Sequence, residues 1–153
     1  MGRKRPICGG TALWNSVYAS ARLKLNLPMG NQVLLILSDG NDTGSTHSLS
    51  AALEEVQRSG AVVYCIRYQG SAGTADSQDG LDRLAHETGG LVFDFPAAGY
   101  SEILSRIEAD LRGRYIPGFR PGPARGKTQS HSLRVETVRP GLTVRARQEY
   151  QDR

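Results

Sequence analysis

Aliphatic residues gather in short runs bounded by glycine or proline. The clearest run, at residues 33–37, reads Val-Leu-Leu-Ile-Leu and leads into the acidic turn 38–42. An unbroken apolar run of this length is typical of a strand buried on both faces in the middle of a parallel sheet. The segments 61–68 and 91–95 predict two more buried strands. We therefore expect a sheet built around these three segments.

Helical periodicity fills the segments between these strands. Apolar residues recur every third or fourth position in four segments, which predicts helices at 12–27, 49–59, 81–88 and 100–111. Ser48 and Gly60 have the residue types that begin and end a helix. The polar segment 69–80 is predicted to be a loop. Alternating strands and helices indicate an α/β fold, a three-layer sandwich with a mostly parallel sheet.

The pattern changes after Arg114. Apolar residues at 133–135 and 142–146 alternate with polar ones on either side of a Pro-Gly pair at 140–141. This period of two predicts an antiparallel β-hairpin, and the Pro-Gly pair predicts its turn. A polar linker is expected at 118–130. The chain is thus divided into an α/β unit, 1–114, and a C-terminal hairpin extension, 115–153.

Composition is that of a folded globular chain. Of 153 residues, 39% are hydrophobic and 22% charged, enough for one core. No apolar run approaches the roughly 20 residues that span a bilayer, and no apolar segment of a secretory leader follows the basic start. The sequence as written therefore favours a cytoplasmic location. Two cysteines exclude a disulfide framework.

The positive charge is concentrated near the C-terminus. The net charge is +4, and residues 112–153 hold ten Lys and Arg against three acids. A basic segment can bind nucleic acid or anionic lipid. Here the arginines mostly alternate with apolar residues, which favours the solvated face of a strand. We predict no sequence-specific binding of nucleic acid.

Common catalytic and metal motifs are missing from the sequence. Its histidines, His47, His86 and His131, are scattered, so no zinc motif forms. The pattern that begins at Asp39 matches the first half of an EF-hand loop, but Ser50 stands where a glutamate is required. There is no Gly-x-Ser-x-Gly elbow and no Walker loop. The protein is therefore predicted not to be an enzyme.

Several short motifs carry a family resemblance. Gly9-Gly10-Thr11 stands at the head of the first predicted helix, and Leu37-Ser38-Asp39-Gly40 follows the first predicted strand. Together with Thr88-Gly89-Gly90 and the closing segment 139–147, they resemble the von Willebrand factor type A (VWA) domain. The order and spacing are similar to the bacterial branch described as VWFA-related, common in acidobacteria. The resemblance implies a Rossmann-like fold and a role in protein–protein interaction or adhesion.

The resemblance also implies a metal centre, the metal-ion-dependent adhesion site (MIDAS). In that family a Mg²⁺ or Mn²⁺ ion on top of the sheet captures an acidic side chain of a protein partner, and full-length relatives are expected to be exported or envelope-associated. By resemblance, Thr11 and Asp39 would be metal ligands. The residues expected to surround the metal are Gly10, Ser38, Gly40, Asn41 and Asp42.

One part of the family pattern is missing. The first metal loop, Asp-x-Ser-x-Ser, occurs nowhere in the 153 residues, so the chain is similar to the second half of such a domain, a fragment truncated at its N-terminus. Mg²⁺ requires six oxygen ligands, and a hydroxyl with one carboxylate is too few for firm binding. The strand at 33–37 would also keep an open edge, which predicts self-association through Val33 to Leu37.

Other interpretations of the same residues stay open. Thr11 is suited to cap the first helix, and Asp39 and Asn41 are common turn formers. The chain could then be a metal-independent scaffold or interaction unit. A metal-dependent hydrolase using Asp39 or Asp42 is a further alternative, which the missing general base disfavours.

Overall fold

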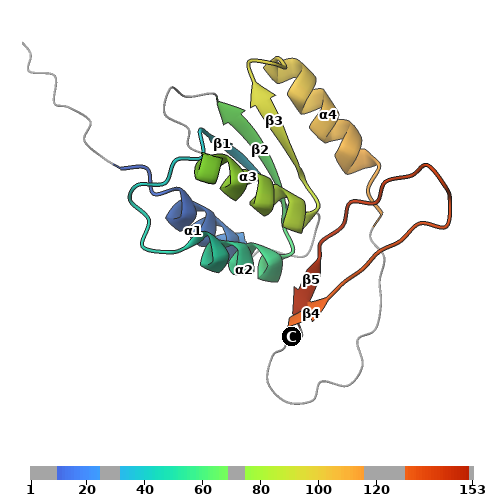
Figure 1. The fold of residues 1–153 in the computed structure, drawn as a ribbon, viewed down its shortest axis with the longest axis horizontal. Coiled ribbons are helices and arrows are strands. Elements are labelled where there is room, and N and C mark those ends of the chain that lie inside the picture. Colours follow the sequence, from blue (N-terminus) through green and yellow to red (C-terminus); the bar gives the residue numbers. More distant parts are fainter. Residues whose placement is uncertain (1–9, 25–31, 69–74, 116–129, 152–153) are drawn as a thin grey trace, which may run out of the picture.

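The computed structural model describes residues 10–24, 32–68, 75–115 and 130–151 (Figure 1). Helices and strands alternate along the chain as the hydrophobic pattern predicts. The elements are α1 Leu13–Lys24, β1 Val33–Ser38, α2 Leu49–Ser59, β2 Val62–Tyr68, α3 Ala75–Thr88, β3 Leu91–Phe95, α4 Tyr100–Arg112, β4 Ser130–Ser132 and β5 Glu149–Gln151.

The main sheet is parallel and has the order β1-β2-β3. Val33 lies level with Val62, and Tyr64 with Leu91. Helices α1, α2 and α3 pack on one face of this sheet, and α4 packs on the other (Figure 1). The predicted α/β architecture with helices on both sides of a parallel sheet is confirmed.

The larger core lies between the sheet and helices α1 to α3. Helix α2 shows how the sequence builds it, because its apolar residues recur on one side and are buried there, namely Ala52, Leu53 and Val56. Ser48 caps α2 by accepting a hydrogen bond from the Ala51 amide at 3.2 Å, and Gly60 ends it with a φ of 73°. Both predicted caps are confirmed. Each large apolar side chain buried here contributes about 1.5 to 3 kcal/mol.

The smaller core lies on the opposite face. Ile103 and Ile107 of α4 pack against Tyr64 and Ile66 of β2 and Phe93 of β3. Alternate residues of β2 therefore enter different cores, and this strand is buried on both faces, as predicted.

Strand β1 agrees with one prediction and differs from another. Within the described residues it pairs with β2 alone, so it has the open edge expected from the missing part of the family pattern, but its apolar run had predicted a strand in the middle of the sheet with both faces buried. Only Ile36 is buried, whereas Leu35 and Leu37 are 40% and 51% exposed. The reason is that α4 packs over β2 and β3 and leaves this face of β1 uncovered.

Helix α3 begins earlier than predicted. It starts at Ala75 rather than Leu81, so residues 75–80 of the predicted loop 69–80 are helical, and 69–74 lies outside the described residues. Its polar first turns carry no apolar period, and a helix extends past its buried stripe because each added residue gains a hydrogen bond. The last residues predicted for the first helix, 25–27, also lie outside the described residues. The same holds for most of the predicted linker 118–130.

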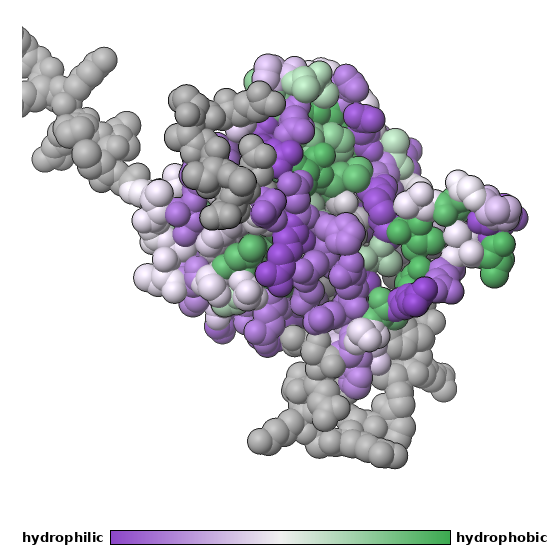
Figure 2. All heavy atoms as spheres, viewed as in Figure 1, coloured by the Kyte–Doolittle hydropathy of each residue, from purple (hydrophilic) through white to green (hydrophobic). Residues whose placement is uncertain are grey.

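The C-terminal segment forms an antiparallel pair, as predicted, but with different strands. The paired segments are β4 and β5, with His131 level with Tyr150. The alternating segments 133–135 and 142–146 lie beyond the paired residues and bury no face of their own. We call residues 130–151 the arm. Figure 2 shows hydrophobic side chains along it, and the exposed ones are Val135, Val138, Leu142 and Val144.

No helix in the described ranges is long and apolar enough to cross a membrane.

Candidate functional site

The candidate site is the loop 39–48, which follows β1 and folds back onto the beginning of α1 (Figure 1). We call this segment the β1–α2 loop. It lies outside the carboxyl end of a parallel strand, where ligands bind in open α/β sheets. Most residues predicted as metal ligands or as neighbours of the metal belong to this loop or to the adjacent residues 10–11.

Three amides at the start of α1 are partnered by side chains of the β1–α2 loop. Asp42 Oδ1 accepts hydrogen bonds from the amides of Leu13, at 2.7 Å, and Trp14, at 3.4 Å. Ser45 Oγ accepts from the amide of Asn15 at 3.0 Å and donates to Asp42 Oδ1 at 2.6 Å. The first amides of a helix lack partners inside the helix, and a carboxylate there also interacts favourably with the helix dipole. Asp42 therefore caps α1, a role the sequence interpretation gave to Thr11.

Asn15 holds the far part of the loop. Its side-chain oxygen accepts from the amides of Thr46, at 3.1 Å, and His47, at 2.9 Å. The ring of His47 stacks on that of Tyr18, with centroids 3.9 Å apart and planes 9° from parallel. The far part of the loop is thus held against α1 by the Asn15 side-chain amide and by ring stacking.

Gly10 and Thr11 contact the loop mainly through their backbone. The amides of Thr43 and Gly44 donate to the Thr11 carbonyl at 3.0 and 3.1 Å, and the Thr11 amide donates to Thr43 Oγ1 at 3.0 Å. A Cβ atom at Gly10 would lie 2.6 Å from Thr43 Oγ1, so the close approach requires glycine. Gly9, which belongs to the same motif, lies outside the described residues.

Asp39 and Asn41 form a turn, as one of the open interpretations expected. Asp39 Oδ1 accepts from the Asn41 amide at 3.1 Å, and Asp39 Oδ2 accepts from Asn41 Nδ2 at 3.0 Å. Ser38 Oγ accepts from the Gly40 amide at 3.1 Å. Asp and Asn side chains often stabilise turns by bonding to the backbone two residues on. Both oxygens of the Asp39 carboxylate therefore already have protein donors.

These contacts fit a firmly held Mg²⁺ poorly. Asp39 and Asp42 accept hydrogen bonds from the chain, and within the described residues no hydrogen bond joins Thr11 to Asp39. Within the described residues, no group of three or more His, Cys, Asp or Glu could hold a metal ion. Mg²⁺ demands six well-placed oxygens. The loop takes its shape from protein donors instead.

Sequence reasoning missed three residues of this site. Asn15, Thr43 and Ser45 were not among the predicted site residues, although each makes a contact that joins the loop to α1 or to the residues before it. A local signal existed for Asn15, since a polar side chain in the first turn of a helix can accept backbone amides. The partners lie about 30 residues away, and sequence spacing does not reveal such pairs.

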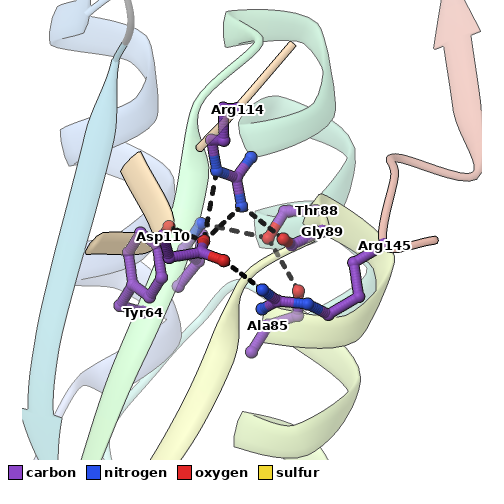
Figure 3. Close-up of polar contacts among 8 residues, drawn as sticks. Tyr64, Ala85, Thr88, Gly89, Asp110, Arg114 and Arg145 are labelled. Carbon is purple, nitrogen blue, oxygen red and sulfur yellow. Dashed lines mark hydrogen bonds and ion pairs between the residues drawn. The ribbon is translucent and has the colours of Figure 1, made fainter. Parts of the chain in front are cut away.

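A second polar cluster is centred on Asp110 of α4 and joins the arm to the body (Figure 3). Asp110 accepts hydrogen bonds from the Tyr64 hydroxyl, at 2.5 Å, from Arg114, at 3.2 Å, and from Arg145 of the arm. Arg114 also donates to the Gly89 carbonyl. Burial alone would raise the pKa of Asp110, but the hydrogen bonds from Tyr64 and Arg145 and the two nearby cations lower it overall. We call these four side chains the Asp110 cluster.

The C-terminal part of the arm contacts the body at the ends of α2 and α3, just before β2 and β3 begin. The Gln148 amide donates to the Glu87 carbonyl at 3.4 Å, and Arg147 donates to the Gly60 carbonyl at 3.4 Å. The arm therefore contacts the amino ends of the strands, whereas the β1–α2 loop lies at a carboxyl end. Arg145 and Arg147 were predicted on a solvated strand face, but both contact the body because the arm folds back onto it.

Comparisons with protein-family models, with curated proteins and with solved structures found no match.

Proposed function

We propose that the chain is a protein-interaction module of the VWA type whose binding surface is the β1–α2 loop with the start of α1. The observation that carries the proposal is the capping of α1 by Asp42 and Ser45, which ties this loop to the helix through side-chain hydrogen bonds. A preformed loop loses little conformational entropy when a partner binds. Thr11 and Asp39 belong to the metal-site motif of the family the sequence resembles.

The surface of the loop favours a polar partner. Thr43, His47 and Ser48 are exposed, and they offer hydroxyl and imidazole groups at the end of the sheet. Such donors match the carboxylate of an acidic side chain. We therefore propose an acidic segment of a protein partner as the ligand, with no enzymatic step.

The second candidate is the metal-dependent form of the same module. It is favoured by the backbone contacts between Thr11 and the loop that begins at Asp39, since they bring the two family ligands to one end of the sheet. In this form Asn41 would release the Asp39 carboxylate, and Mg²⁺ or Mn²⁺ would supply the positive charge that captures an acidic partner.

Calorimetry and NMR separate the two forms. Titration with Mg²⁺ or Mn²⁺ is expected to give only weak binding, whereas low micromolar binding that is lost in Asp39→Ala would support the metal-dependent form. Titration of the isotope-labelled protein with hexaglutamate in EDTA is expected to shift the amides of residues 10–15 and 43–48. Shifts that appear only with metal would favour the second candidate, and shifts confined to other regions in both conditions would contradict both.

A further inference from the structure

The outer edge of β1 combines unpaired backbone with exposed apolar side chains. Within the described residues β1 has a neighbour on one side only, β2. Leu35 and Leu37 are 40% and 51% exposed on the face that α4 does not cover. Open strand edges are normally blocked by charge, proline or a bulge, but β1 reads Val-Leu-Leu-Ile-Leu-Ser and has none of these.

The hydrogen bonds to β2 determine which residues face outward. The Gln32 carbonyl accepts from the Val62 amide at 3.0 Å. In a parallel strand the amide and carbonyl of one residue point to the same neighbour, and successive residues alternate. Leu34 and Ile36 therefore bond to β2 as Gln32 does, while the backbone groups of Val33, Leu35 and Leu37 point to the open edge.

The same alternation governs the side chains. Leu35 and Leu37 are two residues apart, so their side chains lie on one face, and it is the exposed face. Val33 lies on that face as well and packs at the margin of the smaller core. The residues that offer backbone hydrogen bonds at the edge are thus the residues that offer apolar surface beside it.

We propose that this edge binds the same edge of a second copy, with the two β1 strands antiparallel about a twofold axis at Leu35. Leu35 then lies opposite Leu35, and Val33 lies opposite Leu37. In this register the outward backbone groups of each copy meet those of the other, and all the exposed apolar side chains fall on one face. The result is one continuous sheet of order β3-β2-β1-β1-β2-β3.

A second copy suits this edge because the strand is complementary to itself. β1 has no charged residue, so pairing it with itself places no like charges opposite each other. Asp39 lies four residues beyond the axial Leu35 in each copy, and the two chains run in opposite directions from the axis. The two Asp39 carboxylates are therefore separated by about 26 Å, at about 3.3 Å per residue. A twofold interface of one patch with itself is also the commonest kind in homo-oligomers.

Sedimentation and light scattering over a range of protein concentrations test the dimer. The unmodified protein is expected to shift from monomer to dimer, and Leu35→Lys is expected to abolish the dimer, because two ammonium groups would face each other at the axis. The matched control is Leu23→Lys on α1, where the leucine is 71% exposed; it is expected to leave the dimer intact. Circular dichroism checks that each variant is folded.

A mixing experiment tests the register. Leu35→Lys and Leu35→Glu proteins, each monomeric alone, are expected to form a heterodimer when mixed, because only the axial position faces itself. A protein that is monomeric at every concentration would overturn the proposal, as would a dimer that survives Leu35→Lys. Dimerisation without rescue on mixing would overturn the register. None of these outcomes depends on ligand binding by the β1–α2 loop.

Discussion

The two ends of the sheet are joined to distant segments in different ways. At the carboxyl end, the β1–α2 loop is attached to α1 by helix caps and by side-chain bonds to backbone amides, with Asp42 as its one ionised acceptor at the helix. At the amino end, the arm is attached by the ion pair of its Arg145 with Asp110, a carboxylate that also pairs with Arg114 of the body. We therefore expect the second attachment to respond more strongly to pH and ionic strength than the first.

The largest effect is expected at the Asp110 cluster. Asp110→Ala leaves the Tyr64 hydroxyl and two guanidinium groups without their common acceptor, which should lower the free energy of unfolding by about 2 to 4 kcal/mol. Urea denaturation measures it. The control is Glu108→Ala on the same helix, whose ion pair with Arg112 is exposed and should contribute less than about 0.5 kcal/mol. Equal losses in the two variants would show that the cluster does not hold the arm.

A smaller loss is expected at the other end. Asp42→Ala removes the acceptor of the first two amides of α1, and loss of a helix cap costs about 1 to 2 kcal/mol. Asp42→Asn keeps an oxygen acceptor, so it should lower the free energy of unfolding by only a few tenths of the loss expected for Asp42→Ala. Urea denaturation gives the stabilities, and amide hydrogen exchange should show faster exchange at Leu13 and Trp14 in the alanine variant. Unchanged exchange at these amides would contradict the capping role.

The two ends should also differ in their response to acid. The pKa of Asp110 is lowered in the folded protein, since its hydrogen bonds and neighbouring cations outweigh burial. A lowered pKa adds stability above the unfolded-state pKa of about 3.9, and this stability is lost as pH falls through the folded-state pKa. The stability gap between the unmodified protein and Asp110→Asn should therefore narrow below about pH 4. A gap that stays constant from neutral to acidic pH would contradict the assignment.

The smallest effect is expected from salt. The Arg145 side chain is 40% exposed where it pairs with Asp110, so the cost of Arg145→Gln should fall by about 0.5 kcal/mol between 0.05 and 1 M NaCl. Asn15→Ala removes an uncharged acceptor, and its cost should not change with salt. Thermal melts of the three proteins at both salt concentrations measure this difference. The same salt response in both variants would remove the distinction between the two attachments.

The elements that could be predicted from the sequence are those with a strong local signal. The caps of α2 and the apolar stripe of α4 follow local rules, and the structure has both. The position of β1 could not be predicted in this way, because its apolar run is the same whether or not a neighbour covers it. Exposure of Leu35 depends on where α4 packs, and that is a property of the whole fold.

The candidate site was predicted only in part for the same reason. Asp39 and Asn41 form the turn that their residue types favour, since their contact spans two residues. The contact of Asp42 with Leu13 spans 29 residues, and that of Arg145 with Asp110 spans 35. No local pattern distinguishes these side chains from other acids and arginines, so their partners became visible only in the folded chain.

The capping of α1 by Asp42 has a consequence for the order of folding during synthesis. Helix α1 has 12 residues, and a helix of that length is only marginally stable alone. Its first amides gain their partners only after β1 and the loop that carries Asp42 have emerged from the ribosome. A nascent chain that ends before residue 42 should therefore carry a frayed first helix, which becomes ordered when the loop emerges.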